Sequence, residues 1–136
     1  MGTSIIHDEE NRARDAIARV ARSLFDRGLT HGSTGNISVR LGDELLVTPT
    51  GSSFGSLDPA RITRLDAAGR VVAGDPPSKE AFLHLAMYQE RASAGAVVHL
   101  HSTHSVAASV LADVDPADVL PPLTAYYVMR IGTLPL

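Results

Sequence analysis

Two histidines separated by one residue, His99 and His101, are the side chains whose type and spacing point most directly to chemistry. They lie in the run 96–101, which predicts a strand. Alternate residues of a strand point to the same face, about 6.5–7 Å apart, so both imidazoles could bind one metal ion. Two polar residues on a solvated strand face would show the same spacing, and the spacing alone does not decide between the two. We expect His104 to be an exposed helix residue, with a third metal ligand as the alternative.

A predicted helix begins near Ser78, Lys79 and Glu80, directly after two prolines. The first N–H groups of a helix lack intrahelical partners, so a helix N-terminus can bind an anion, and Lys79, the chain's only lysine, would strengthen such a site. Ser78 is the expected N-cap. For Glu80 the alternative role is a carboxylate that only complements the helix dipole.

Two loops of small polar residues, 32–36 and 48–53, could bind a phosphate through their backbone amides. Asn36 and Thr50 would add side-chain donors. Most loops of this composition are only turns. Neither loop has the GxxxxGK[ST] or GxGxxG pattern of nucleotide-binding folds, so nucleotide binding is disfavoured.

The elements that would position these residues alternate between helix and strand along the chain. Periodicity and turn signals predict helices over 8–27, 79–91 and 102–111, a short helix opened by Asp58-Pro59, hairpins over 37–48 and 62–73, and strands over 96–101 and 124–131. Interleaved helices and hairpins favour an α/β or α+β fold whose sheet is at least partly antiparallel.

Two of these elements carry specific packing expectations. The helix over 79–91 would bury an apolar stripe made of Phe82, Leu83, Ala86 and Met87. In the strand over 96–101, Val98 and Leu100 would point away from the two histidines and into the core.

Composition narrows the class of protein. The 136 residues, 44% of them hydrophobic, suit a single domain over 1–136 with its own core. No cysteine is present, which excludes disulfides, thiolate metal sites and cysteine nucleophiles. A formal net charge of −3 argues against a general nucleic-acid surface. No apolar stretch reaches the length of a membrane span and the N-terminus is polar, so we expect a cytoplasmic protein without a membrane partner.

Four motifs in order along the chain resemble those of the class II aldolase/adducin family: 32–38 (GSTGNIS), 48–51 (TPTG), 77–80 (PSKE) and 97–102 (VVHLHS). The resemblance extends from the first predicted helix to Leu136. It implies an α/β fold in αβα layers, with a mostly antiparallel central sheet flanked by helices. Within the family, the chain is most similar to the 3-oxo-tetronate 4-phosphate decarboxylases, in the third motif, in the loop 48–52 and in Tyr127–Arg130.

The resemblance also implies roles for individual residues. His99 and His101 match two of the family's three zinc-binding histidines, and Glu80 matches the glutamate that approaches the metal and acts as acid and base. The positions that hold the substrate phosphate are matched by Asn36, Thr50, Gly51 and Ser78, with Thr34 close by. Lys79 stands at the same substrate site, where the aldolases have a second serine, and Tyr126 matches a tyrosine that reaches a neighbouring subunit's site.

The activity that the resemblance implies is a lyase reaction on a small phosphorylated sugar acid. A divalent metal, Zn²⁺ or another, would stabilise the enediolate left when a carbon–carbon bond breaks. Decarboxylation of a 3-oxo-tetronate 4-phosphate to a triose phosphate and CO2 is the expected reaction, and the charge of Lys79 would favour such an acid substrate. Cleavage by a fuculose-1-phosphate-type aldolase, sugar-phosphate 4-epimerisation and an adducin-like binding role without catalysis are the alternatives.

One part of the family's pattern does not occur in this sequence. The family's third histidine ligand comes later in the domain, and the sequence ends at Leu136. We therefore expect the chain to be the N-terminal portion of the domain, truncated at Leu136, with the third ligand beyond it. The resemblance further implies a homo-oligomer, usually a tetramer with sites at subunit boundaries.

Overall fold

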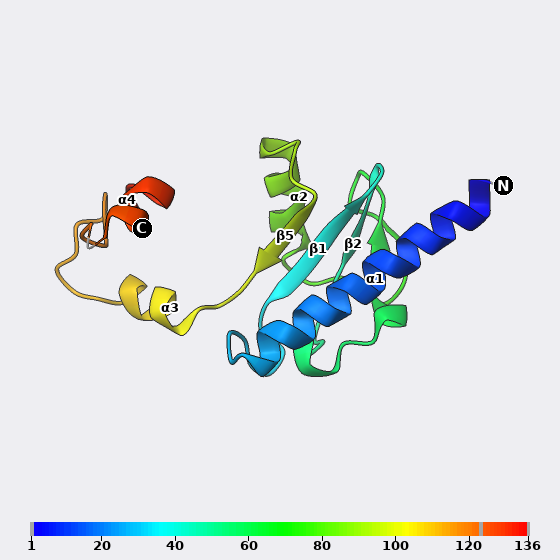
Figure 1. The fold of residues 1–136 in the computed structure, drawn as a ribbon, viewed down its shortest axis with the longest axis horizontal. Coiled ribbons are helices and arrows are strands. Elements are labelled where there is room, and N and C mark those ends of the chain that lie inside the picture. The colour runs from blue at the N-terminus through cyan, green and yellow to red at the C-terminus, as the bar shows by residue number, and fades with distance from the viewer. Residues whose placement is uncertain (1, 123, 136) are drawn as a thin grey trace. The chain divides into compact units, whose positions relative to one another are not determined.

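The computed structural model describes residues 2–122 and 124–135, which form two compact units divided between Leu100 and His101 (Figure 1). The expected truncation point, Leu136, lies outside the described residues. A single domain over 1–136 stays a prediction. Among the described residues, no helix is both long and apolar enough to cross a membrane.

The first unit is built on a five-stranded sheet with the order β4-β3-β2-β1-β5, in which every neighbouring pair is antiparallel. Its strands are β1 (Asn36–Leu41), β2 (Glu44–Val47), β3 (Thr63–Leu65), β4 (Val71–Ala73) and β5 (Ala96–His99). Both predicted hairpins are confirmed as β1–β2 and β3–β4. The expected antiparallel sheet flanked by helices is confirmed as well.

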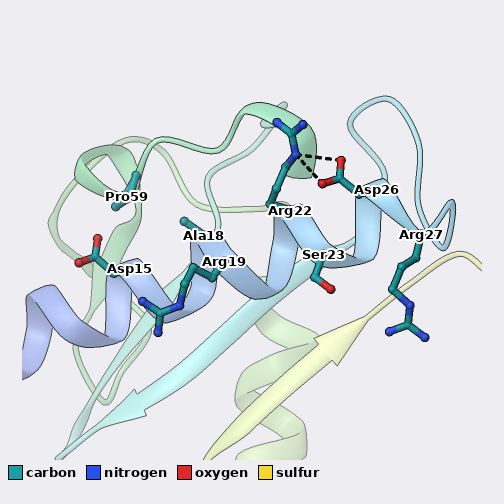
Figure 2. A pocket seen from close by; sticks show the side chains of 8 residues that line it. All are labelled: Asp15, Ala18, Arg19, Arg22, Ser23, Asp26, Arg27 and Pro59. Carbon is teal, nitrogen blue, oxygen red and sulfur yellow. Dashed lines mark hydrogen bonds and ion pairs between the residues drawn. The ribbon is translucent and has the colours of Figure 1, made fainter.

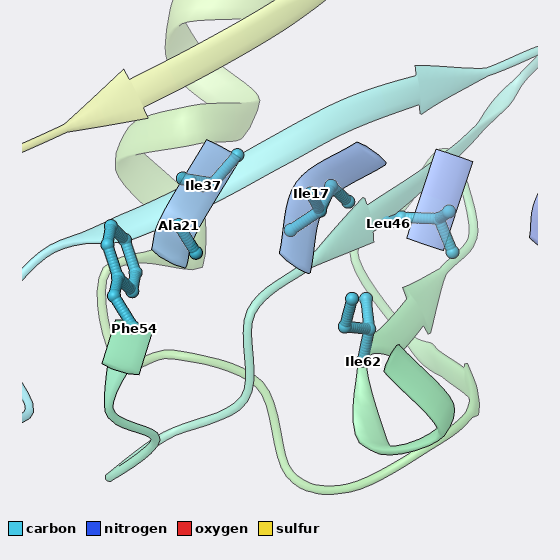
Figure 3. Close-up of a cluster of buried hydrophobic side chains, with 6 residues drawn as sticks. All are labelled: Ile17, Ala21, Ile37, Leu46, Phe54 and Ile62. Atoms are coloured by element: carbon cyan, nitrogen blue, oxygen red, sulfur yellow. The ribbon is translucent and has the colours of Figure 1, made fainter. Parts of the chain in front are cut away.

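One face of the sheet is covered by α1 (Gly2–Asp26), which begins earlier than the predicted Asp8. Figure 3 shows the core between this helix and the sheet, to which the 3-10 helix η1 (Phe54–Ser56) contributes Phe54. Ile62, directly after the 3-10 helix η2 (Pro59–Arg61), contributes as well. The buried apolar side chains of this cluster are Ile17, Ala21, Ile37, Leu46, Phe54 and Ile62. The predicted cap of the short helix is confirmed, because the Asp58 carboxylate accepts the N–H of Ala60 at 2.9 Å.

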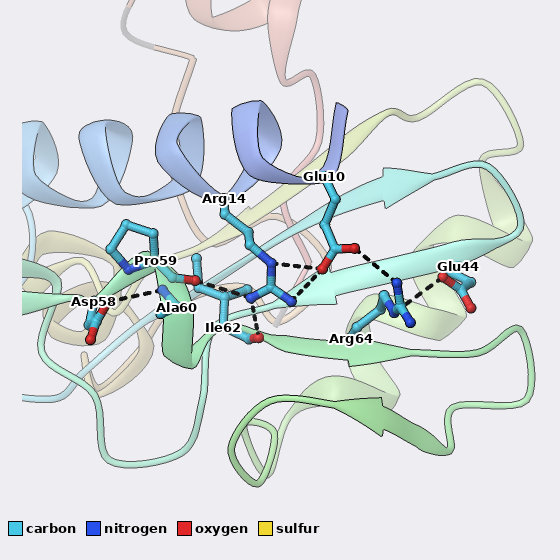
Figure 4. Close-up of polar contacts among 8 residues, drawn as sticks. All are labelled: Glu10, Arg14, Glu44, Asp58, Pro59, Ala60, Ile62 and Arg64. Atoms are coloured by element: carbon cyan, nitrogen blue, oxygen red, sulfur yellow. Dashed lines mark hydrogen bonds and ion pairs between the residues drawn. The ribbon is translucent and has the colours of Figure 1, made fainter. Parts of the chain in front are cut away.

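A nearly buried ion-pair network also fastens α1 to the sheet (Figure 4). The Arg14 guanidinium donates to Glu10 and to the backbone carbonyls of Pro59 and Ile62, while Arg64 of β3 donates to the other oxygen of Glu10. Burial alone would raise the pKa of Glu10, but the hydrogen bonds and charges of the two arginines hold it below its ordinary value.

The other face of the sheet is covered by α2 (Ala81–Glu90), and here the predicted apolar stripe is wrong. The side chains of Phe82, Ala86 and Met87 are exposed, whereas His84 and Tyr88 are buried. The reason lies in β1, which presents the buried hydroxyl of Ser38 to this face, so that polar side chains of α2 can be buried with hydrogen-bond partners.

Two boundaries near the candidate site also differ from expectation. The N-cap position of α2 is Glu80, not Ser78, whose hydroxyl instead accepts the N–H of Glu80 at 3.3 Å in the turn before the helix. Strand β5 ends at His99, so His101 lies beyond the strand. Val98 is half exposed and not in a core, while Leu100 packs against the apolar cluster under α1.

The second unit contains α3 (Thr103–Ser109) and α4 (Ala125–Arg130). The first confirms the helix predicted over 102–111, with Ser102 as its N-cap. The second replaces the strand predicted over 124–131. Thr124 caps this helix by accepting the N–H of Tyr127 at 3.1 Å, an interaction that favours helix over the β-propensity of the aromatic and branched residues.

Candidate metal and substrate site

The pairing of β1 with β5 places Asn36 directly opposite His99. Both residues stand on the face of the sheet that α2 covers, like the next pair along that face, Ser38 and Val97. The backbones can come this close because residue 35 is a glycine. Gly35 has a φ of +82°, and a Cβ on it would lie 2.9 Å from the carbonyl oxygen of His99, so a larger residue would displace the end of β5.

Glu80, at the start of α2, joins these two residues. The amide nitrogen of Asn36 donates to Glu80 Oε2 at 2.5 Å, and His99 Nδ1 lies 3.2 Å from the same oxygen. The side chain of Asn36 is buried, while those of Glu80 and His99 are partly exposed. A carboxylate and an imidazole thus meet at a solvent-accessible edge, where small molecules can reach them.

His101 completes a group of side chains that could hold a metal ion. One ligand atom each from Glu80, His99 and His101 lies within 4.8 Å of the others. Imidazole nitrogen and carboxylate oxygen are the donors that Zn²⁺ takes in catalytic sites with three protein ligands, and other divalent metals accept them too. The donor set of this group therefore fits a divalent metal.

Behind the candidate metal group lies a line of buried polar side chains that sequence reasoning missed. His84 Nε2 is 2.5 Å from Asn36 Oδ1, its Nδ1 is 2.7 Å from Ser38 Oγ, and Ser38 Oγ is 2.9 Å from the hydroxyl of Tyr88. Burial, assisted by the nearby His99, lowers the pKa of His84 to about 4. Burial also raises the pKa of Tyr88. The available signal was the spacing of Glu80, His84 and Tyr88 at every fourth position, which stacks them on one helix face.

The predicted phosphate-binding loop lies beside the start of α2. Thr50 N–H donates to the carbonyl of Pro76 at 2.9 Å, and Ser78 N–H donates to the carbonyl of Thr48 at 3.1 Å. These bonds bring Thr50, Gly51 and Ser78 into one neighbourhood, with Thr50 and Gly51 exposed. The structure therefore gathers three of the predicted phosphate contacts.

The remaining predicted residues lie in different settings. The hydroxyl of Thr34 donates to the carbonyl of His31 at 2.7 Å in the loop before β1. Lys79 is exposed. Tyr126 belongs to the second unit, where it is exposed and carries the Arg130 guanidinium over its ring at 5.6 Å. His104 is an exposed residue of α3, as expected of a helix residue.

A hollow of about 780 Å³ beside α1 lies away from these residues (Figure 2). Its charged lining includes Arg22 and Asp26, which form an exposed ion pair at 2.8 Å. None of the predicted site residues lines it. The volume of a hollow therefore does not identify the candidate site, which is identified by the metal-binding side chains of Glu80, His99 and His101.

Comparison with known proteins shows which family the chain is similar to. Residues 15–136 match the family model for the class II aldolase and adducin N-terminal domain. The chain is 50% identical over 127 residues to a 3-oxo-tetronate 4-phosphate decarboxylase of Cupriavidus necator, covering 93% of this chain and 58% of that protein. It is 39% identical over 103 residues to an L-fuculose phosphate aldolase of Escherichia coli, covering 76% of this chain and 48% of that protein.

Solved structures agree with the sequence matches. A crystal structure of Escherichia coli YgbL, described as a putative aldolase/epimerase/decarboxylase, has a TM-score of 0.83 and 46% identity over 93% of this chain and 61% of that one. A Thermus thermophilus L-fuculose-1-phosphate aldolase has a TM-score of 0.71 and 28% identity over 91% of this chain and 60% of that one. The chain thus spans about three fifths of the length of the decarboxylase and of YgbL, and about half of the length of the Escherichia coli aldolase. It belongs to the class II aldolase and adducin family.

Proposed function

We propose that this protein is a metal-dependent carbon–carbon lyase that decarboxylates a 3-oxo-tetronate 4-phosphate to a triose phosphate and CO2. The observation that carries the proposal is the 50% identity with a 3-oxo-tetronate 4-phosphate decarboxylase over 93% of this chain. Identity with the L-fuculose phosphate aldolase is lower, at 39% over 76% of the chain. The protein would act in the cytoplasm on a soluble sugar-acid phosphate.

In this proposal Glu80, His99 and His101 hold a divalent metal, with Zn²⁺ as the ion of choice. The support is the donor set of this group and the closeness of its ligand atoms. When bound, such an ion supplies Lewis-acid stabilisation of negative charge that develops on a substrate oxygen.

Glu80 is also the proposed proton carrier. Loss of CO2 breaks the bond to the carboxylate and leaves its electron pair on the neighbouring carbon, conjugated with the carbonyl group. That carbon must then take up one proton. Glu80 suits this task because its Oε2 is held by Asn36 and His99 at an edge that a substrate can reach.

The substrate's phosphate and carboxylate need cationic or N–H donors. We assign Thr50, Gly51 and Ser78 to the phosphate, because the loop 48–51 is hydrogen-bonded to the segment before α2. For Thr34 and Asn36 the phosphate role rests on the resemblance to the family alone. Lys79 adds a full positive charge that an acid substrate would use. Tyr126 would reach the site of a neighbouring subunit in a homotetramer, whose existence sedimentation analysis tests directly.

The test is an assay of the intact, zinc-loaded protein with two substrates, a 3-oxo-tetronate 4-phosphate and L-fuculose 1-phosphate. We expect CO2 release from the first, and loss of that activity in Glu80→Gln. Lys79→Ser should lower kcat/KM for an acid substrate more than for an aldol substrate, while equal losses would argue against the assigned role of Lys79.

Other outcomes identify the alternatives. Aldehyde release from L-fuculose 1-phosphate without CO2 release would favour an aldolase, as the similarity to L-fuculose phosphate aldolases allows. Inversion at a sugar-phosphate C4 would favour an epimerase. A binding module would be indicated if the intact protein bound no divalent ion and the substitution His99→Ala changed nothing.

A further inference from the structure

In the line of hydrogen bonds that runs from Glu80 to Tyr88, the chemistry of each side chain determines which group is the donor and which the acceptor. A carboxylate only accepts, so the amide nitrogen of Asn36 must face Glu80, which leaves the amide oxygen facing His84. That oxygen needs a donor, so His84 Nε2 must carry the proton. His84 is only 1% exposed, and a buried neutral imidazole has a single N–H, so its Nδ1 is an acceptor.

Because His84 Nδ1 is an acceptor, the direction of the next two hydrogen bonds is determined as well. Ser38 must donate its O–H to His84 Nδ1. The same serine oxygen then accepts the O–H of Tyr88, 2.9 Å away. The result is a chain of donors that points one way, from Tyr88 through Ser38, His84 and Asn36 to Glu80. The first three links join α2 to β1, and the last joins Asn36 of β1 to Glu80, the N-cap residue of α2.

We infer that His84 is a positioning residue, which holds the Asn36 amide with its nitrogen toward Glu80 and so fixes the carboxylate for metal binding and proton transfer. If the amide turned over, its oxygen would face the carboxylate and repel it. The other His84 tautomer would place a lone pair against Asn36 Oδ1 and permit that reversal. This inference rests on the proposed function for the metal binding and the proton transfer; the orientation of the amide stands independently of it.

Two variants of His84 separate this role from simple filling of the core. In His84→Gln the side-chain amide reaches the position of Nε2 and can still donate to Asn36. In His84→Asn the shorter side chain reaches only the position of Nδ1, so Ser38 keeps its acceptor but Asn36 loses its donor. Urea unfolding of both, without metal, shows whether each variant folds.

The measurements are the zinc dissociation constant, by competition with a chelator, and kcat for CO2 release. We expect His84→Asn to weaken zinc binding or lower kcat by about tenfold, the lower end of the range for residues that support metal ligands. His84→Gln should stay within about threefold of the unaltered protein. Equal losses in both variants, or no loss in either, would overturn the inference.

The unaltered protein provides a test that needs no variant to fold. Long-range ¹H–¹⁵N NMR of the zinc-free protein should show His84 as the Nε2–H tautomer, and an Nδ1–H tautomer would also overturn the inference. If CO2 is not released while zinc binding falls in His84→Asn alone, the proposed reaction fails and the positioning role stands.

Discussion

A single buried imidazole makes the stability of this protein depend on pH. His84 has a pKa of about 4 in the folded chain, because burial disfavours its charged form, against 6.5 for an ordinary histidine. Between these values the unfolded chain binds a proton that the folded chain does not. The free energy of unfolding should therefore fall as pH is lowered from about 6.5 to about 4, by at most about 1.4 kcal/mol for each pH unit from this group.

Urea unfolding of the metal-free protein at several pH values measures this dependence. Above about 6.5 both states hold a neutral ring, and below about 4 both are charged, so the contribution of His84 changes only between those limits. His84→Gln has no titrating group at this position, and its curve should be flatter over that window. The prediction is wrong if the variant and the unaltered protein lose stability in parallel.

The chemistry at the residue scale could be predicted from the sequence only where it depended on local spacing. His99 and His101 lie close together because one residue separates them. Glu80 lies close to both histidines, and its contact with Asn36 depends on the pairing of β1 with β5 and on how α2 packs. His84 was missed because its partners, Ser38 and Asn36, lie more than forty positions away in sequence.

At the scale of elements, α1 allows a matched comparison of two ion pairs. Glu10–Arg14 and Arg22–Asp26 are both spaced i,i+4, but the side chains of the first pair are about one tenth exposed and those of the second more than half. Glu10→Gln would leave the guanidinium of Arg14 buried without its counter-charge. We expect it to lower the free energy of unfolding by about 2–3 kcal/mol.

Asp26→Asn is the control, since it makes the same chemical change in the exposed pair. Its cost should be below about 1 kcal/mol, because water and salt screen exposed charges. Urea unfolding near neutral pH gives both values. Similar costs for the two variants would mean that the network of Glu10, Arg14 and Arg64 does not fasten α1 to the sheet.

The elements themselves were predicted well where a single local signal dominates. The turn at 42–43 and the Asp58-Pro59 cap gave correct boundaries. The helix at 125–130 was mistaken for a strand because β-propensity was counted and the Thr124 cap was not. The buried face of α2 was wrong because its apolar residues were assumed to point inward, whereas the sheet offers a polar partner at Ser38.

At the scale of the whole molecule, the candidate ligands come from segments that unfolding would separate. Glu80 stands at the start of α2, and His99 is the last residue of β5, which follows that helix in the sequence. A metal that binds both can bind tightly only when the sheet and α2 are assembled. Zn²⁺ should therefore stabilise the first unit as a whole, by about 2.7 kcal/mol at a free concentration one hundred times its dissociation constant.

Urea unfolding with and without Zn²⁺ measures this linkage, and two histidine variants locate it. His99→Ala should remove most of the stabilisation, because the ion loses a ligand on β5. His104→Ala should retain it, since that histidine is exposed on α3 and is absent from the ligand group. If the two variants lost the effect equally, or if His99→Ala kept it, the stabilising zinc would bind elsewhere, and Glu80 would need another reason to face His99.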